Sequence, residues 1–442
     1  MGRTVSKASG YAPEDEQFDP RTDDFVSKER NYTHFDLPLT EVERTGISFS
    51  DNDILSHSFW PLLGYIDVQR RAKQQPSGQL IFEDKERPIK FGSHRDAALL
   101  EYYASTLSIK YEDFLLAKEL TGSVLAYRKG TGNNVDQAKS LFDEIRSRKC
   151  CTAIAIDIKG FFDNIDHKVL KSCLQDVYGE PQLTKPAYKI FKRMTEFEWV
   201  DSDLLKLRLG VKYGRSGRIC TSKEFREHVR GTKPNLVNRN RTNIGIPQGT
   251  PLSGLYANIS LARFDQEAYD YLRSVGGSYR RYSDDIAVLV PESISPDDVL
   301  LFLAGRLGAI GLKISENKTE IRKFPTGSDG LSSDKPFQYL GFTFDGKRIL
   351  IRQSSLTRYY AKMHAGIRSK IRAAKNGGID RDKIFLRELF KRYTHFGKRR
   401  NFPRYAYMAS NKMESPEIRH QIRNHFTIFK RVLRNYIDRA YI

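Results

Sequence analysis

The chain has 442 residues, of which 74 are Lys or Arg and 54 are Asp or Glu, so its formal net charge is +20. Apolar residues make up 39% and aromatic residues 12%, which is enough to bury a core and excludes a disordered, collagenous or disulfide-stapled chain. The length predicts two or three domains or one multi-lobed enzyme. The charge predicts a polyanionic partner.

Most of the positive charge lies near the C-terminus. Residues 346–442 hold 25 Lys and Arg against 6 Asp and Glu, a net charge of +19. A charge run is often only a solvated surface. So lopsided a segment repels itself, however, unless a polyanion neutralises it.

Targeting signals and cysteine-based zinc or redox motifs are missing from the sequence. The cysteines Cys150, Cys151, Cys173 and Cys220 have neither zinc-ligand nor redox spacing, which favours a reducing, cytoplasmic location. No apolar signal segment begins the chain and no membrane span is expected. Residues 1–40 are polar and predict a flexible arm.

Periodicity predicts the elements in chain order. In the first part of the chain we expect a helix at 51–65, strands at 79–84 and 86–91, a helix at 94–116 and a strand ending at Asp157. A loop and helix at 245–275, a hairpin at 278–291 and a helix at 296–311 follow. A strand at 312–321 and a hairpin at 337–351, turned at Asp345-Gly346, precede helices. The irregular alternation predicts an α+β fold with helices on one face of a sheet.

Three aspartates are the chemical centre of the sequence. Asp157 ends a buried strand, and Asp284 and Asp285 lie together in a hairpin turn. Adjacent carboxylates repel each other unless cations neutralise them, and such oxygen ligands suit Mg²⁺. In isolation, Ser-Asp-Asp is more often just a turn sequence.

The motifs D-I-K-G-F-F-D, G-I-P-Q-G-T-P-L-S and Y-S-D-D follow one another in the chain. From about Ile81 to Phe344 the chain resembles the reverse transcriptases, within them the bacterial branch of group II intron, retron and defence-associated enzymes. Its segments DKERPIKF and AYRKGTGNN are similar to the two fingers motifs, ISENKTEI to the fourth palm motif and FQYLGFTF to the primer grip.

The resemblance implies a right-hand polymerase with fingers, palm and an α-helical thumb. Its divisions would be a flexible arm at 1–40, an N-terminal region with the fingers at 41–149, a palm at 150–345 and a basic helical thumb at 346–442. A basic insert at 199–243 has no predicted role beyond contact with nucleic acid.

By the same resemblance, Asp157, Asp284, Asp285 and the Ile158 carbonyl would hold two Mg²⁺ ions, for which Mn²⁺ could substitute. Phe162 would exclude a ribose 2′-hydroxyl, with a core aromatic beside Phe161 as the alternative. Around the incoming nucleotide and at its pyrophosphate, the residues implied are Lys85, Arg87, Gln248, Gly249 and Lys318.

The family likeness also implies contacts with template and primer. The residues concerned are Arg128, Lys129, Tyr339, Leu340, Gly341, Lys398, Arg399 and Arg400. In the basic segment, Arg and Lys interleave with aromatic residues, a pattern typical of RNA binding, although part of these aromatics will form a helical core.

The sequence thus predicts an RNA-directed DNA polymerase that uses dNTPs to copy an RNA template into DNA. The chain lacks a C-terminal endonuclease and the V-T-G thumb signature of retrons, and it looks most like stand-alone antiphage reverse transcriptases that copy a co-encoded, structured non-coding RNA. A group II intron or retron-type enzyme, a maturase and an inactive RNA-binding scaffold are the alternatives. Template, priming, product and oligomeric state stay open.

Overall fold

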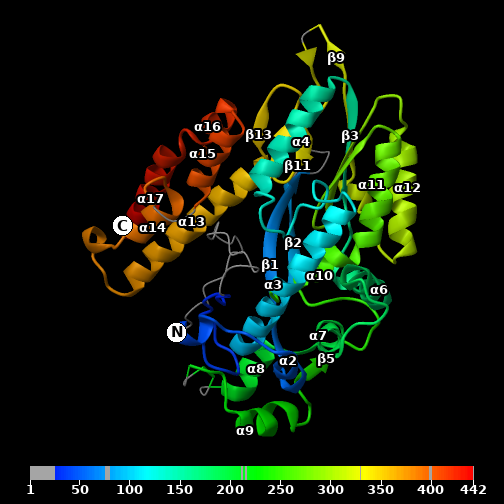
Figure 1. The fold of residues 1–442 in the computed structure, drawn as a ribbon. Helices are drawn as coiled ribbons and strands as arrows, with labels where there is room; N and C mark the ends of the chain where they lie inside the picture. The colour runs from blue at the N-terminus through cyan, green and yellow to red at the C-terminus, as the bar shows by residue number, and fades with distance from the viewer. Residues whose placement is uncertain are drawn as a thin grey trace.

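The fold is given by a computed structural model that describes residues 25–74, 80–210, 213–214, 217–328, 330–397 and 401–441. Helices and mainly antiparallel strands alternate irregularly along the chain, which confirms the predicted α+β class. The C-terminal helices lie on one side of the molecule, and α11 and α12 lie on the opposite side (Figure 1). Within the described ranges, no helix is long and apolar enough to cross a membrane.

A four-stranded antiparallel sheet, in the order β6-β7-β3-β8, forms the centre of the molecule. Its strands are β6 (Ser278–Tyr282), β7 (Asp285–Val290), β3 (Cys151–Asp157) and β8 (Glu320–Phe324). Ile154 and Ile156 of β3 face one core, whereas Ala153 and Ala155, which alternate with them, face another. Burial on both faces explains why the inner strands are almost continuously apolar.

Both faces of this sheet are covered. The larger core contains α3 (His94–Ala117), α6 (His167–Tyr178), α7 (Lys185–Thr195), α10 (Ser253–Ser260), α11 (Ala262–Ser274) and α12 (Pro296–Ala309). On the other face lie α4 (Asn134–Arg148), part of the C-terminal helices and a second sheet. The expectation of helices on one face only is therefore wrong, because β3 and β7 carry apolar side chains on both sides.

The second sheet has three antiparallel strands, β11 (Phe337–Tyr339), β12 (Phe342–Phe344) and β13 (Ile349–Ile351). The predicted single hairpin is thus a three-stranded meander, whose first turn lies at Leu340 and Gly341 with φ of 46° and 94°. Two positive φ values in succession are typical of tight hairpin turns. The strand expected at 312–321 instead starts at Glu320, after a helical turn at Glu316–Lys318. A short ribbon of β9 (Thr326–Gly327) and β10 (Gly330–Leu331) lies between β8 and β11 in the chain.

Another four-stranded sheet, in the order β2-β1-β4-β5, forms the predicted fingers region. Strands β1 (Leu62–Gln74) and β2 (Leu80–Phe91) pair along their whole length as a long hairpin. The expected helix at 51–65 covers only α2 (Asp51–Ser56), because Pro61 disfavours helical backbone before it and the apolar residues after it join β1. The two strands expected at 79–91 are one continuous strand.

The basic insert belongs to this fingers sheet rather than to the palm. Its strand β4 (Glu198–Asp201) runs parallel to β1, with Leu63 opposite Val200, and pairs on its other side with β5 (Val237–Arg239). Between them lie α8 (Ser202–Leu209), α9 (Ser222–Phe225) and a π-helical turn (Arg226–Arg230). Leu205, Phe225 and Val229 pack with Phe35 and Leu63 in a separate small core.

Part of the predicted flexible arm is anchored to α3. Ser27 and Arg30 both donate hydrogen bonds to Glu101, at 2.9 and 2.8 Å. Asp36 accepts hydrogen bonds from the backbone N–H groups of His94 and Arg95. The helix α1 (Glu41–Arg44) follows. Residues 25–40 are therefore ordered, in contrast to the expectation, while residues 1–24 lie outside the described ranges.

The C-terminal region is helical, as predicted, but it is divided between two cores. Its elements are α13 (Gln353–Asn376), a 3₁₀ turn (Arg381–Lys383), α14 (Arg387–Tyr393), α15 (Phe402–Lys412), α16 (Pro416–Ile422) and α17 (His425–Tyr441). Helices α13, α14 and α17 share one core, whereas α15 and α16 pack mainly against the second sheet. The helices begin after β13, so the expected boundary at 346 falls inside that sheet.

Candidate active site

Two aspartates face each other at one end of the two inner strands of the central sheet. Asp157, the last residue of β3, is directly opposite Asp285, the first residue of β7. Asp284 and Ser283 form the two-residue turn that joins β6 to β7, where Tyr282 pairs with Asp285. Ser283 has a φ of 62°, which is uncommon for a residue other than glycine. The sheet therefore brings the three predicted carboxylates to one edge.

Backbone contacts fix this edge. The Ile158 N–H donates to the Asp284 carbonyl at 3.0 Å, and the Ser315 N–H donates to the Asp157 carbonyl at 2.8 Å. The Lys318 ammonium forms an ion pair with the Asp157 carboxylate. Lys318, which was predicted to act on pyrophosphate, is thus already at the aspartates.

The electrostatics of the three carboxylates are unfavourable without a cation. Asp285 keeps part of its surface exposed, yet desolvation by the surrounding protein, followed by Asp284 and Asp157, raises its pKa to about 7. Lys318 and Arg352 oppose this shift. An opposed carboxylate pair with a third neighbour is a donor set that suits a divalent cation.

No group of three or more His, Cys, Asp or Glu side chains in the described part of the chain is arranged to hold a metal ion. The Lys318 ammonium is paired with the Asp157 carboxylate, and a divalent cation would have to compete with it for that carboxylate. The roles of Asp157, Ile158, Asp284 and Asp285 as ligands therefore stay predictions.

The Pro-Gln-Gly loop joins the fingers to the palm. The Lys90 N–H in β2 donates to the Gln248 carbonyl at 2.7 Å, and the Ile246 N–H donates to the Phe162 carbonyl at 2.9 Å. Phe162, in α5 (Phe161–Asn164), is half-buried and its ring centroid lies 5.6 Å from that of Phe161. Gly249 has a φ of 115°, and the close approach that it allows is to the Lys90 backbone.

The predicted primer-grip hairpin lies within electrostatic reach of the aspartates. Burial raises the pKa of Tyr339, Arg280 opposes the shift, and Asp285 adds to it. Leu340 and Gly341 form the turn of this hairpin. The side-chain amide of Asn134 donates to the Leu340 carbonyl at 3.1 Å, and the Arg352 N–H donates to the Gly341 carbonyl at 3.0 Å, so both ends of the turn are held.

The sequence comparison matches this part of the chain. Residues 110–344 match a family model described as reverse transcriptase (RNA-dependent DNA polymerase). The chain belongs to the reverse transcriptase family. The match contains Asp157, Gln248, Asp284, Asp285 and the hairpin at Tyr339, and it ends before the basic helices. A search of curated proteins finds no match.

Solved structures show weaker likenesses. Apo telomerase from Candida Tropicalis is 12% identical, with 87% of this chain and 63% of that chain covered and a TM-score of 0.43. Telomerase from Candida albicans with a fragment of telomeric RNA is 14% identical, with 88% and 65% covered and a TM-score of 0.40. The RNA-dependent RNA polymerase of a human picorbirnavirus is 10% identical, with 64% and 43% covered and a TM-score of 0.33. The chain spans less than two thirds of each of these structures.

Lys85 and Arg87 of this reverse transcriptase chain lie on β2, opposite Gln69 and Asp67 of β1. Residues two apart on a strand project to the same face. Burial raises the pKa of Tyr127, Asp284 adds to the shift and Arg87 opposes it, so Arg87 and Asp284 both lie within electrostatic reach of Tyr127.

The Arg128 side chain is engaged in contacts within the protein. Its guanidinium forms an ion pair with Glu112 at 2.5 Å, donates to the Thr121 carbonyl at 2.8 Å and to that of Val124, and is 4% exposed. These contacts use most of the guanidinium N–H groups, and the contact of Arg128 with nucleic acid stays a prediction. The neighbouring Lys129 is exposed.

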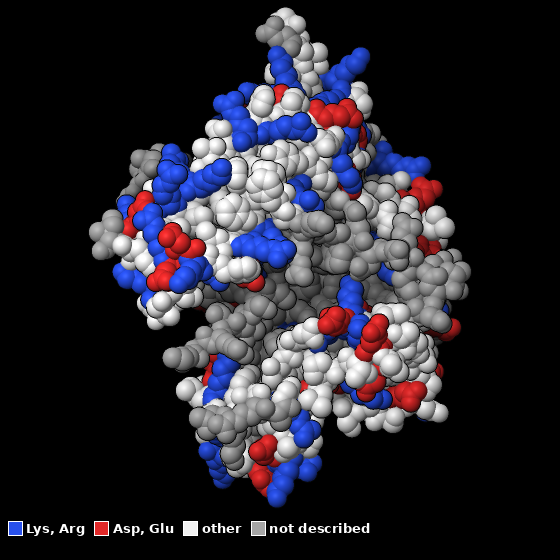
Figure 2. All heavy atoms as spheres, turned by 90° about the vertical axis from the view of Figure 1, so that its left-hand side faces the viewer, with Lys and Arg blue, Asp and Glu red and all other residues white. Residues whose placement is uncertain are grey.

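Of the remaining predicted residues, Lys398, Arg399 and Arg400 lie outside the described ranges. Figure 2 shows that Lys and Arg outnumber Asp and Glu over the C-terminal helices. On α13, Arg358, Lys362 and Arg372 are exposed and have no ion-pair partner among the described residues.

Sequence reasoning missed the residues that support the site. Asp163 receives a hydrogen bond from Gln248 and lies near Lys90; burial raises its pKa while both neighbours lower it. Tyr127 has its hydroxyl 3.1 Å from the Ser283 hydroxyl. Arg281 and Asp265 form a fully buried ion pair behind the turn. Arg281 directly precedes Y-S-D-D, which is the one sequence signal that pointed to it.

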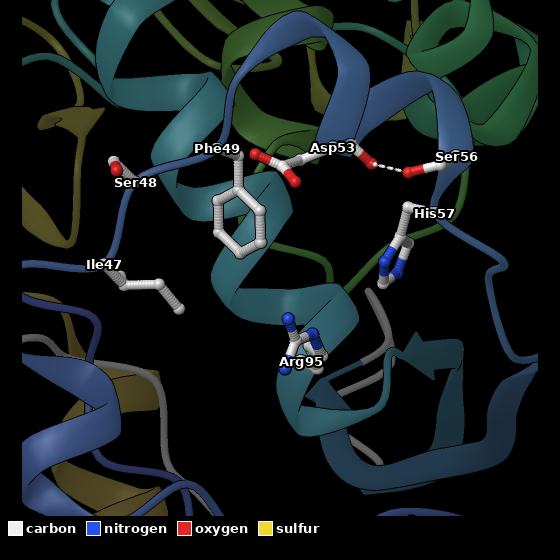
Figure 3. A pocket seen from close by; sticks show the side chains of 7 residues that line it. All are labelled: Ile47, Ser48, Phe49, Asp53, Ser56, His57 and Arg95. Atoms are coloured by element: carbon white, nitrogen blue, oxygen red, sulfur yellow. Dashed lines mark hydrogen bonds between the residues drawn. The ribbon is translucent and has the colours of Figure 1, made fainter.

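A pocket of about 200 Å³ lies away from these residues, where α2 meets the start of α3 (Figure 3). Phe49, Asp53, His57 and Arg95 are among the side chains that line it. Asp53 is used in the cap of α2, and the His57 ring lies 2.7 Å from Asp96. None of the predicted site residues reaches this pocket.

Proposed function

We propose that the chain is an RNA-directed DNA polymerase that synthesises DNA from dNTPs on an RNA template. The observation that carries the proposal is the pairing of Asp157 with Asp285 across the palm sheet, with Asp284 in the adjoining turn. Repulsion and desolvation make such a set of carboxylates, at the end of otherwise apolar strands, energetically unfavourable unless it binds cations.

The carboxylates of Asp157, Asp284 and Asp285, with the Ile158 carbonyl, would hold two Mg²⁺ ions, or Mn²⁺ in their place. Bound in this way, the ions activate the attacking hydroxyl and neutralise the pyrophosphate. Lys318 would leave the Asp157 carboxylate if a cation bound there, and its ammonium would then be available to donate a proton to pyrophosphate.

The residues around the aspartates are proposed to select and hold the nucleotide. Lys85 and Arg87 bind the triphosphate from the fingers hairpin, since a guanidinium can donate two parallel hydrogen bonds to phosphate oxygens. Phe162 excludes a ribose 2′-hydroxyl by its volume. Gln248, on a loop that Gly249 holds against β2, contacts the nucleotide.

The C-terminal helices are proposed to act as the thumb, and their Lys and Arg side chains to bind the phosphates of the template-primer duplex. Lys129 and the hairpin at Tyr339 would contact template and primer strands. More specifically, we propose that the template is a structured non-coding RNA encoded with the enzyme, in an antiphage role. The basic, aromatic-rich segment from residue 346 onward supports a structured RNA as the template. The free thiols of all four cysteines fit a reducing, cytoplasmic location.

Primer extension tests the proposal. Purified protein, supplied with Mg²⁺, dNTPs and a primed RNA template, should extend the primer with deoxynucleotides. Sequencing the RNA that co-purifies with the protein, and the DNA it makes, tests the specific template. A protein that binds RNA but extends no primer on any template would contradict the assignment.

A second candidate is an RNA-binding scaffold without catalytic activity. The observation in its favour is the ion pair of Lys318 with Asp157, which neutralises one of the three carboxylates without any metal. Mn²⁺ binding separates the two candidates, because a scaffold retains the ion pair and binds no Mn²⁺ at the aspartates.

A further inference from the structure

The side chain of Arg281, on β6, is buried directly behind the turn that carries Asp284 and Asp285. Both Arg281 and its partner Asp265, on α11, have side chains with 0% exposure. Their pairing is bidentate, because Nε and Nη2 of Arg281 donate to the two Asp265 carboxylate oxygens at 2.7 and 2.6 Å. Burial alone would lower the pKa of Arg281, but Asp265 raises it above its usual value, so the guanidinium is charged.

Every N–H of the guanidinium has an acceptor. Nη1 donates to the Asn258 side-chain carbonyl at 3.0 Å and to the Ser283 main-chain carbonyl at 3.1 Å. The second N–H of Nη2 is directed to the Asn258 main-chain carbonyl at 3.4 Å. One rigid planar group therefore connects α10, α11 and the turn, and a lysine with its single nitrogen could not make all these contacts.

The partners of Arg281 are themselves fixed. The Tyr279 hydroxyl donates to Asp265 at 2.6 Å, and the Asn258 amide donates to the Ala126 carbonyl at 2.6 Å. The Arg281 backbone N–H donates to the Ser123 carbonyl at 2.7 Å, and its carbonyl accepts from the Leu125 N–H at 2.9 Å. The guanidinium thus holds the Ser283 carbonyl against a frame that has little freedom to move.

The turn needs such a support, because Ser283 has a positive φ of 62° and lies between two strands of the sheet. A conformation of this kind is unfavourable for a residue other than glycine and persists only when the surroundings determine it. A buried ion pair, by contrast, is weak evidence for stability, since well-packed apolar residues of similar volume often do as well. Stability alone therefore does not account for a charged pair at this position.

The geometry points to Arg281 as a positioning residue, locked by Asp265 and Asn258, that sets the Ser283 carbonyl and thereby the direction of the Asp284 and Asp285 carboxylates. This inference rests on the proposed function, for which those carboxylates hold the catalytic ions. Arg281 itself is not expected to contact nucleotide or nucleic acid, because its side chain is fully enclosed.

Two variants separate positioning from stability. Arg281→Lys keeps the charge beside Asp265 but loses the fork that reaches Ser283 and Asn258. The triple variant Arg281→Met, Asp265→Leu, Tyr279→Phe removes the ion pair and the hydroxyl that would lose its acceptor and fills the space with apolar side chains, while the carbonyls of Asn258 and Ser283 lose their donor. As a matched control, Arg263→Met with Asp176→Leu removes another bidentate pair, between α11 and α6, that is partly exposed and, among the described residues, has no hydrogen bond to the turn.

Three quantities are measured on the full chain: melting temperature, Mn²⁺ affinity by electron paramagnetic resonance, and kcat and KM for dNTP in primer extension. For both Arg281 variants we expect a melting temperature within about 4 °C of wild type. We also expect Mn²⁺ affinity and kcat to be lower by about 10- to 100-fold, with KM for dNTP unchanged. The control variant should match wild type in all three.

Arg281→Lys with wild-type Mn²⁺ affinity and kcat would overturn the inference, even if the triple variant failed to fold. A wild-type protein that binds Mn²⁺ but makes no DNA would instead contradict the proposed function, and the Mn²⁺ affinities would still test Arg281. A wild-type protein that binds no Mn²⁺ contradicts both.

Discussion

Gly249 is a position where a side chain has no room. A Cβ there would lie 3.0 Å from both the Ile89 Cγ2 and the Lys90 carbonyl oxygen, and its φ of 115° is one that other residues rarely adopt. The glycine therefore lets the Pro-Gln-Gly loop lie against the end of β2, which couples the fingers to the palm.

Replacing this glycine should destabilise the protein. For Gly249→Ala we expect a loss of about 1–3 kcal/mol in the free energy of unfolding, measured by urea denaturation, because both the backbone and the new methyl group are strained. Gly305→Ala is the control, since Gly305 lies within α12 with no atom near its Cβ position. An unaffected Gly249→Ala variant would show that the loop is free to move away from β2.

Phe162 has two possible roles that one substitution distinguishes. It is half-buried beside Phe161, so it could serve the core, the nucleotide site or both. If its ring excludes the 2′-hydroxyl, Phe162→Ala should reduce the preference for dNTP over NTP by roughly 10- to 200-fold. The measurement is the ratio of kcat/KM values for one matched pair of nucleotides. Unchanged sugar discrimination would assign Phe162 to the core. Phe161→Ala is the control, because it shows how the loss of a neighbouring core ring alone affects sugar discrimination.

At the scale of elements, α3 depends on a residue from the preceding segment. Asp36 accepts hydrogen bonds from the first two backbone N–H groups of the helix, at 3.0 Å from His94 and 2.9 Å from Arg95, and contacts the His94 ring at 2.8 Å. Burial opposes ionisation of Asp36, but these hydrogen bonds lower its pKa to about 2. A carboxylate at a helix N-terminus is favoured by the helix dipole as well.

This pKa gives a pH dependence with a definite sign. Because the pKa in the folded state is below the ordinary value, the stabilisation is fully present above about pH 4 and is lost as pH falls toward 2. Wild type should therefore exceed Asp36→Asn by about 1–2 kcal/mol in unfolding free energy near neutral pH. The difference should shrink in acid, as followed by urea denaturation at several pH values. A difference that does not change with pH would contradict the assignment of the pKa.

Helix α13 offers the clearest test of the thumb. Arg358, Lys362 and Arg372 fall within an arc of about 80° on its surface. If each binds a phosphate, replacing all three with Gln should lower the salt dependence of RNA binding by about 2–3 units in the slope of log K against log salt. The control is Lys139→Gln with Arg146→Gln on α4, where both cations pair with Asp143. An unchanged slope would place the RNA elsewhere.

For the whole molecule, local pattern predicted local structure well. The apolar run ending at Asp157, the amphipathic helix at 94–116 and the hairpin around Asp284 all occur in the structure, because each is determined by residues near one another in sequence. The order of the motifs also predicted that Asp157, Asp284 and Asp285 lie close together, and the pairing of β3 with β7 places them so.

Pairing between distant segments could not be predicted in this way. Nothing in the residues around Trp199 signals a parallel partner in β1, 137 positions earlier in the chain, where Leu62 pairs with Trp199 and Gly64 with Asp201. Likewise, nothing near Arg128 in the sequence signals its ion pair with Glu112, which lies on a different element. Charge alone does not show which arginines are paired within the protein.

The aspartates at the junction of β3 and β7 are proposed to catalyse DNA synthesis on RNA. The most direct test is single-turnover incorporation of a dNTP on a primed RNA template with Mg²⁺, comparing wild type with Asp285→Asn, while RNA binding is measured in parallel. We predict that wild type extends the primer, and that Asp285→Asn is slower by about 10³-fold or more although it binds the same RNA. Equal rates for the two proteins, or no incorporation by wild type, would contradict the account.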